Sequence, residues 1–199
     1  MEISVIITNY NYGSHLSRAV RSLKGQSFNQ NEFEVIVIDD GSTDNSREII
    51  ESLGSYIKPI YNEHNVGLAT SCNKAIRATI GKYVIRLDAD DYVAMDWLKV
   101  HHLFLSNNKG EMDATSSDYL EVDENENPIR RKNGMTFPIA CGVMYKTDHM
   151  IELGLYDAGL PREDVEFRQR FIKSGRQIFN IPIPLYRYTQ HQSSLTKGL

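Results

Sequence analysis

Cysteine is scarce in this sequence: Cys72 and Cys141 are the only two, and they do not form a C-x-x-C pair. A disulfide framework or a structural zinc site is therefore not expected, and a reducing, cytoplasmic compartment is the default. No apolar run approaches the roughly 20 residues that a transmembrane helix requires. The first residues also lack the basic start and the length of a signal peptide. We expect no integral membrane segment, and peripheral association with the inner face of the membrane stays open.

An excess of positive charge and glycine-rich phosphate loops are also missing. The formal net charge of −4 gives no electrostatic reason to expect nucleic acid as a partner. Neither G-x-G-x-x-G nor G-x-x-x-x-G-K occurs, which disfavours dinucleotide-dependent oxidoreductases and P-loop NTPases. A bound diphosphate would therefore need a divalent ion to neutralise its charge.

The first 91 residues alternate between apolar, strand-like runs and segments with helical periodicity. Strands are predicted over residues 3–8, 33–38, 56–61 and 82–87. Ser42 or Thr43 is expected to cap the helix that follows the second strand. The strict alternation predicts an α/β fold with a mostly parallel sheet and right-handed crossovers. The carboxyl ends of these strands would then share one edge.

The pattern changes after residue 91. We predict a helix over 97–105, strand-like pieces around 119–122, a hairpin tip at 123–127, a strand over 142–146, helices over 147–153 and 164–173, and a strand over 178–181. An aromatic and basic tail follows at residues 185–191. No linker separates this half from the first, so it is expected to form the second layer of the same domain.

Three carboxylates, Asp88, Asp90 and Asp91, end the fourth predicted strand. Ligands of open α/β sheets bind at the carboxyl edge, and clustered carboxylates commonly hold a hard divalent ion. Alternation along an extended chain sends Asp88 and Asp90 to the same side. The plainer alternative is one helix cap with solvated turn charges, since a D-x-D triplet alone is a weak signal. We favour a role in binding metal and ribose.

Asp39 ends the second predicted strand in the same way. An ionised carboxylate accepts hydrogen bonds and donates none, so it suits a base with a ring N–H, such as uracil or guanine. Tyr10, in the loop after the first strand, is placed to stack on that base. Helix capping by acid and ordinary packing of the tyrosine are the plainer readings.

Two further groups could complete such a site. Glu163 and Asp164 precede an apolar helical face, where acid commonly complements the helix dipole; beside a sugar-nucleotide site, such a carboxylate could deprotonate an acceptor hydroxyl. In the tail, the imidazole of His191 could join a metal's ligands, and Arg187 could meet phosphate. Each of these residues also has an ordinary structural reading.

Taken together, the motifs resemble family 2 of the inverting glycosyltransferases, with the GT-A fold. The matching segments run nearly end to end: Ser4–Asn11, Glu34–Asp44, Asn65–Gly67 with Asn73, Gly81–Val84, Leu87–Asp91, Gly154–Asp157, Glu163–Phe167, and Tyr186–Tyr188 with His191. The resemblance implies one GT-A domain over residues 1–199, with a nucleotide-binding half (1–91) and an acceptor-side half (92–199).

The resemblance also implies roles on the donor side. Thr8 and Tyr10 would hold the base, with Asp39 at its N3 position. In the segment Asp88-Ala89-Asp90, the first carboxylate would contact the ribose and the second would coordinate Mg²⁺ or Mn²⁺, leaving Asp91 as a structural residue.

On the acceptor side, Asp164 would be the catalytic base, with Glu163 as its neighbour and substitute, and His191 an accessory metal or phosphate ligand. The family often carries arginine immediately before the residue matching Asn73, and this chain has Cys72 there. The metal or Arg187 would then carry more of the contact with the diphosphate.

The implied activity is inverting, metal-dependent transfer of a sugar, most simply from a UDP-sugar, to a saccharide or glycolipid acceptor in the synthesis of a cell-envelope polysaccharide or glycoconjugate. The alternatives are a binding module without turnover and a domain of a larger synthase. A nucleotidyltransferase is disfavoured because residues 8–14 contain neither lysine nor arginine. The sugar, the acceptor and the oligomeric state are not encoded in these motifs.

Overall fold

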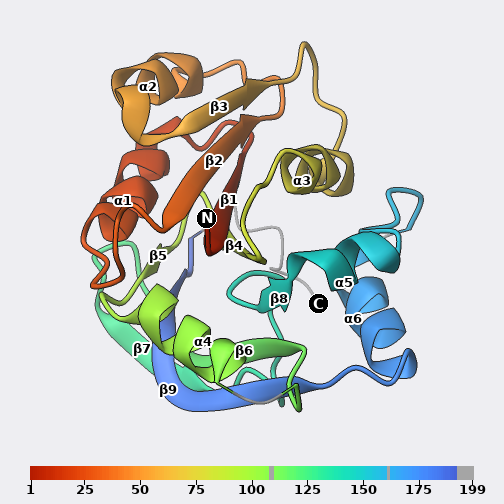
Figure 1. Ribbon diagram of the computed structural model, residues 1–199. Helices are drawn as coiled ribbons and strands as arrows, with labels where there is room; N and C mark the ends of the chain where they lie inside the picture. Colours follow the sequence, from red (N-terminus) through yellow and green to blue (C-terminus); the bar gives the residue numbers. More distant parts are fainter. Residues whose placement is uncertain (108–109, 161, 192–199) are drawn as a thin grey trace.

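A mixed β-sheet forms the centre of the computed structural model, which describes residues 1–107, 110–160 and 162–191 (Figure 1). Its strands lie in the order β3-β2-β1-β4-β8-β6-β9-β5, and β7 pairs with β6 outside this path. The strands are β1 (Ile3–Asn9), β2 (Phe33–Asp39), β3 (Lys58–Tyr61), β4 (Tyr83–Asp88), β5 (Tyr92–Val93), β6 (Ala114–Val122), β7 (Pro128–Lys132), β8 (Met144–Lys146) and β9 (Ile178–Thr189).

Helices connect these strands and cover both faces of the sheet (Figure 1). They are α1 (Gly13–Lys24), α2 (Ser46–Ser52), the 3₁₀ turn η1 (Gly54–Tyr56), α3 (Leu68–Arg77), α4 (Trp97–Ser106), α5 (Thr147–Glu152) and α6 (Glu163–Lys173). In the described part of the chain, no helix is both long enough and apolar enough to cross a membrane.

The predicted parallel block is confirmed. Strands β3, β2, β1 and β4 are all parallel neighbours. The register aligns Asn9 with Asp39 and Thr8 with Asp88 at the carboxyl ends. Because residues in register share a face and neighbours along a strand alternate, Thr8 and Asp88 face one side of the sheet while Asn9 and Asp39 face the other.

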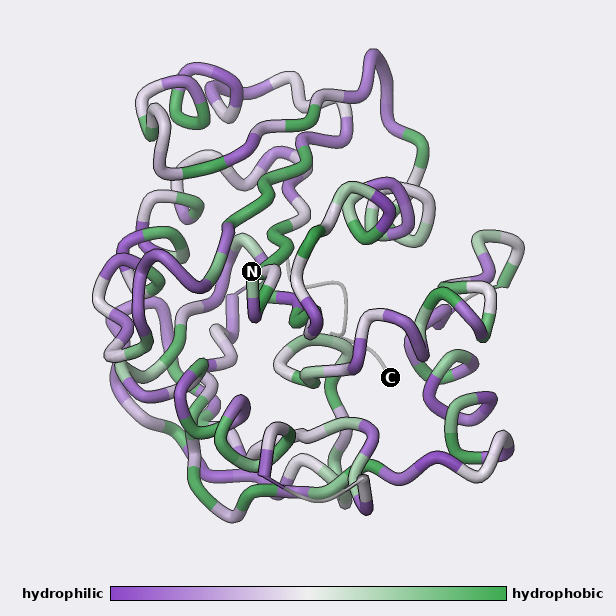
Figure 2. Tube along the Cα trace, in the orientation of Figure 1, coloured by the Kyte–Doolittle hydropathy of each residue, from purple (hydrophilic) through white to green (hydrophobic). Residues whose placement is uncertain are grey.

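Two apolar clusters, one on each face, hold this sheet in place. Residues Ile3, Val5 and Ile7 of β1 pack with α1 and α4, whereas Ile6 packs with α3, α5 and α6. The central strands are mostly hydrophobic and the outer turns mostly hydrophilic (Figure 2). Burial on both faces explains why β1 and β2 are nearly continuous apolar runs, as parallel strands covered by helices require.

Two expectations about element boundaries were wrong. Helix α2 begins at Ser46, so neither Ser42 nor Thr43 caps it; the Ser42 hydroxyl instead donates to the Asp39 carboxylate. The last strand does not end at residue 181, because β9 continues to Thr189 by pairing with β6 and β5. A competing hydrogen bond three residues away decides the first point, and long-range strand pairing, which local periodicity does not encode, decides the second.

His101 on α4 provides a test of the core. Its ring is fully buried against Thr115, and burial lowers its pKa to about 3. The folded state therefore favours the neutral ring, and stability is lost as pH falls below the ordinary value of 6.5, where the unfolded chain takes up a proton. Between pH 7.5 and pH 5, we expect this to cost about 2 kcal/mol.

Urea unfolding of wild type and His101→Gln at both pH values measures this loss. The variant should lose about 2 kcal/mol less stability on acidification, whereas replacing the exposed His64 by Gln should leave the pH dependence as in wild type. Equal acid sensitivity of His101→Gln and wild type would contradict the assignment.

Candidate active site

The carboxyl ends of β1, β2 and β4 meet at one edge and bring Thr8, Asp39 and Asp88 together, as predicted. Thr8 is half-buried at the end of β1, and Tyr10, just beyond it, is 42% exposed. An exposed aromatic ring at this edge is available to a planar ligand.

Asp39 is buried and fixed by its neighbours. Its Oδ1 accepts hydrogen bonds from the Asn9 side chain (2.9 Å) and the Ser42 hydroxyl (2.5 Å), and its Oδ2 accepts one from the Ser42 backbone N–H (3.1 Å). A carboxylate offers about four acceptor positions, so Oδ2 keeps capacity for another donor.

Asp40 does something different. It accepts hydrogen bonds from the Asn62 side chain (2.8 Å) and from the backbone N–H groups of Val66 and Gly67 (both 3.0 Å). These bonds hold the loop that leads into α3, so Asp40 is structural.

Asp88 forms a forked ion pair with Arg86, two residues earlier on the same face of β4. The Arg86 Nε lies 2.7 Å from Oδ1 and Nη2 lies 3.2 Å from Oδ2. Burial opposes the charge of the guanidinium, but the Asp88 carboxylate outweighs burial and the pKa of Arg86 is raised. The third edge of the guanidinium faces the Cys72 sulfur at 3.8 Å.

Asp90 contacts His191 in the segment that follows β9. His191 Nε2 lies 2.7 Å from Asp90 Oδ2, and the His191 ring stacks on His15 with centroids 5.6 Å apart. Arg18 donates to the Asp90 carbonyl at 2.6 Å. Burial, together with the charge of Asp88, raises the pKa of Asp90, and His191 opposes that shift.

Asp91 turns inward and is 2% exposed. Its carboxylate accepts hydrogen bonds from the Tyr186 hydroxyl (2.7 Å) and from the Thr189 backbone N–H (2.7 Å). Burial, followed by the charges of Asp90 and Asp88, raises the pKa of Asp91 well above the usual value. Asp91 therefore ties the end of β4 to β9.

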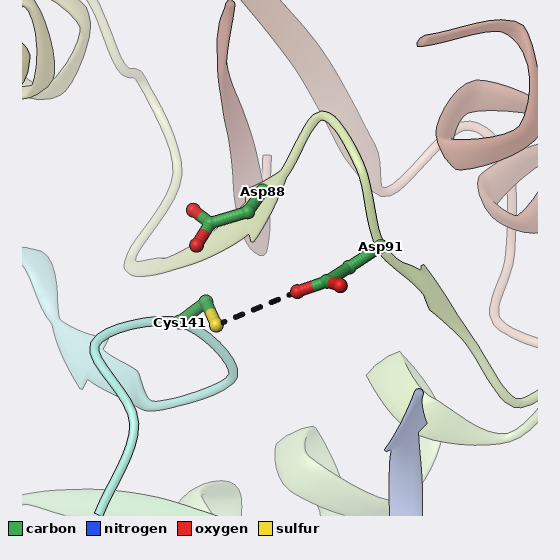
Figure 3. A group of neighbouring side chains, drawn as sticks. All are labelled: Asp88, Asp91 and Cys141. Carbon is green, nitrogen blue, oxygen red and sulfur yellow. Dashed lines mark hydrogen bonds between the residues drawn. The ribbon is translucent and has the colours of Figure 1, made fainter. Parts of the chain in front are cut away.

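Asp88, Asp91 and Cys141 offer ligand atoms within 4.8 Å of one another (Figure 3). Cys141 lies 3.9 Å from Asp91 as a hydrogen-bond donor, and burial raises the pKa of its thiol. A neutral thiol is a poor ligand for Mg²⁺ or Mn²⁺, which prefer oxygen. The predicted pair, Asp90 and His191, offers a carboxylate oxygen and an imidazole nitrogen, which lie 2.7 Å apart.

Glu163 and Asp164 begin α6, across the edge from β4. Asp164 lines a largely apolar cavity of about 220 Å³ together with Tyr145 and Tyr156. Burial raises the pKa of the Tyr156 hydroxyl. The positive charge of Arg86 opposes this rise, and the negative charge of Asp164 adds to it.

A reciprocal clamp joins the two halves. The Asn73 side chain on α3 donates to the Tyr156 carbonyl (2.7 Å) and accepts from the Tyr156 N–H (3.0 Å). Arg170 on α6 donates to the Leu155 carbonyl at 2.7 Å. The loop that contains Tyr156 is therefore fixed to α3, which packs against β1 and β2.

Arg187 lies on β9, and alternation directs it away from the face that Tyr186 takes. Its guanidinium donates to the carbonyls of Pro184 (2.7 Å) and Tyr186 (3.3 Å). Its proposed contact with phosphate stays a prediction, as do the roles of the other site residues.

The sequence of the chain matches the family described as Glycosyl transferase family 2 over residues 4–154. The chain belongs to this family. An uncharacterised glycosyltransferase of Nostoc sp. is 34% identical over 169 residues, which are 74% of this chain and 52% of that protein. The poly(ribitol-phosphate) β-N-acetylglucosaminyltransferase TarS of Staphylococcus aureus is 30% identical over 115 residues, covering 56% of this chain and 20% of TarS. The family predicted from the motifs is confirmed.

Solved structures of other glycosyltransferases share the fold. S. aureus TarS in complex with UDP-GlcNAc superposes with a TM-score of 0.84 at 23% identity, over 98% of this chain and 60% of that one. The mannosyltransferase PcManGT from Pyrobaculum calidifontis, in complex with GDP-Man and Mn²⁺, gives 0.81 at 17% identity, over 97% and 58%. The predicted GT-A fold is confirmed. The matched part of the chain spans about half of the length of the Nostoc relative (52%) and 20% of TarS.

Sequence reasoning missed Arg86 and the partners of Asp91. Arg86 had a visible signal, because a single charge inside an apolar strand, two residues before Asp88, must share its face. Tyr186 and Cys141 had none, because their contact with Asp91 joins segments 95 and 50 residues apart.

Gly41, in the segment Glu34–Asp44, lets two loops approach closely. Its φ is +72°, and a Cβ there would lie 2.5 Å from the His64 carbonyl carbon. We expect Gly41→Ala to lower the free energy of unfolding by about 3 kcal/mol or more, from strain plus a backbone clash. Gly175 has a φ of +87° with no described atom within 4 Å, so Gly175→Ala should lose only about 1 kcal/mol. If urea unfolding shows that the two variants lose the same free energy of unfolding, the predicted clash at Gly41 is wrong.

Proposed function

We propose that this chain is an inverting glycosyltransferase that moves a sugar from a UDP-sugar to an acceptor hydroxyl. One chain of contacts supports this most directly. Arg86 pairs with Asp88 and faces Cys72 on α3, and the next residue, Asn73, is hydrogen-bonded to Tyr156, which lines the same cavity as Asp164. The UDP and UDP-GlcNAc complexes of TarS, whose fold this chain shares, support UDP as the nucleotide.

The base would lie between Tyr10 and the end of β2. Thr8 would contact it, and Asp39 Oδ2 would accept the uracil N3–H, for which it keeps an acceptor position. Asp88 would accept hydrogen bonds from the ribose. Ala89, which is only 2% exposed, would hold the turn between the two carboxylates without occupying the ligand's space.

Asp90 and His191 would hold Mg²⁺ or Mn²⁺, and the GDP-Man complex of PcManGT contains Mn²⁺. When bound, such an ion offsets the charge of the diphosphate. Arg187 would meet the diphosphate only if its side chain left the carbonyls that it now contacts.

Asp164 would take the proton from the acceptor hydroxyl as that oxygen attacks the anomeric carbon opposite the leaving UDP, which inverts the configuration. Glu163 beside it is the substitute base. The cavity next to Asp164 would hold part of the acceptor, a saccharide or glycolipid. We place the acceptor in cell-envelope polysaccharide or glycoconjugate synthesis because TarS, a relative, acts on poly(ribitol-phosphate).

Two organisational predictions belong to this proposal. Residues 1–199 would act as one GT-A domain, and both cysteines, which are free and buried, support a reducing compartment such as the cytoplasm.

The Asp39 role is tested by nucleotide selectivity. With Mn²⁺ present, calorimetric titration should give UDP a Kd at least tenfold below that of CDP, because cytosine has no N3–H to donate. Asp39→Asn should bring the two constants together, whereas Asp44→Asn, whose carboxylate accepts the backbone N–H groups that begin α1 and α2, should keep the preference. Equal affinity of the wild type for UDP and CDP would overturn this role.

The Asp164 role is tested by turnover. UDP-sugars, UDP-GlcNAc among them, should be hydrolysed by the wild type, and Asp164→Asn should reduce kcat about 100-fold or more while leaving the Kd for UDP within about twofold. Glu166→Gln is the matched control, because Glu166 lies in the same helical turn but is paired with Arg170. Unchanged turnover in Asp164→Asn would remove it as the base.

A further inference from the structure

Arg86 is a buried cation with no part in the mechanism above. Its side chain is 6% exposed, in the middle of β4, among residues that are otherwise apolar. Burying a guanidinium without compensation is costly, so its contacts must satisfy it. Two of those contacts are hydrogen bonds to Asp88, the carboxylate proposed to bind the ribose of the nucleotide.

The fork fixes the plane of the Asp88 carboxylate. Arg86 donates from Nε to one oxygen at 2.7 Å and from Nη2 to the other at 3.2 Å. A bidentate pair of this kind sets orientation as well as energy. The fork uses one acceptor position on each oxygen, and the Asp88 side chain is still 25% exposed at the sheet edge. The remaining acceptor positions are therefore available to a ligand in a defined direction.

The guanidinium is itself prevented from turning. Its Nη1 faces the Cys72 sulfur at 3.8 Å, and Cys72 is fully buried on α3. Burial raises the pKa of that thiol to about 11, so it is neutral and does not compete with Asp88 for the cation. Cys72 lies next to Asn73, which clamps the loop before α6. Arg86 is thus held between a rigid helix and the carboxylate that it orients.

We propose that Arg86 is a positioning residue for ribose recognition: its fork holds Asp88 in the single orientation that lets the carboxylate accept hydrogen bonds from the ribose hydroxyls. This proposal rests on the function proposed above. Charge alone is not enough for this role, because an ammonium group cannot form the planar fork.

The test compares UDP with 2′,3′-dideoxyuridine diphosphate, which lacks both ribose hydroxyls, by calorimetric titration in the presence of Mn²⁺. The wild type should bind UDP about tenfold more tightly than the dideoxy compound, which is a ratio of dissociation constants of about ten. Asp88→Asn, Arg86→Met and Arg86→Lys should all reduce that ratio to about twofold or less. Because each ratio is taken within one variant, a general loss of affinity or of folded protein cancels.

Arg170→Met is the matched control, since Arg170 forks onto Glu166 through the same two nitrogens, on α6. It should keep the wild-type ratio. Arg86→Lys keeps a cation in place, so it tests the proposal even if Arg86→Met does not fold.

The outcomes separate this proposal from the one it rests on. A wild-type ratio retained in Arg86→Lys, with the ratio lost in Asp88→Asn, overturns the role of Arg86 and leaves the proposed function standing. Equal binding of the two nucleotides by the wild type removes ribose recognition by Asp88 and, with it, this inference; the preference for UDP over CDP is unaffected. If the wild type binds no UDP, the proposed function itself fails.

Discussion

Repulsion between three carboxylates within four residues is the constraint on which this structure depends. Asp88, Asp90 and Asp91 follow a buried strand, where low polarity strengthens like-charge repulsion. Each carboxylate is accommodated by a different partner: a guanidinium for Asp88, an imidazole for Asp90, and a phenol with a backbone N–H for Asp91. Arg86 lies on the same strand as Asp88, whereas Tyr186, Thr189 and His191 all come from the end of β9 and just beyond it, so the acidic turn depends on the packing of β9 against it.

This division of partners separates the roles of the three residues. Asp91 is enclosed and ties β4 to β9, which makes it structural. Asp88 and Asp90 stay partly exposed, at 25% and 21% of their side chains, and are accessible to a ligand. The Asn73 clamp then ties α3 to Tyr156, which lines the same cavity as Asp164. The proposed chemistry thus depends on contacts that hold β4, β9 and α3 together.

Much of the donor half could be predicted from the sequence because its signals are local. Apolar runs identified β1, β2 and β4, and acid directly after each of the latter two marked Asp39 and Asp88 at one edge. The cap of α2 was wrong because Ser42 bonds to Asp39 instead, and local preference did not reveal that competition. Arg86 could have been recognised by alternation. The sequence shows Cys72 where the family often has arginine. It does not show that the Arg86 guanidinium of β4 lies against this cysteine.

By itself, the sequence determined the family, the alternation of parallel strands with helices in the first half and the carboxylates at the strand ends, because periodicity and motif spacing act over short stretches. Only the tertiary structure decided which partner each carboxylate meets. His191 reaches Asp90 across 101 residues, Tyr186 reaches Asp91 across 95, and Asn73 reaches Tyr156 across 83. Such contacts arise when strands and helices pack, and no local pattern in the chain encodes that packing.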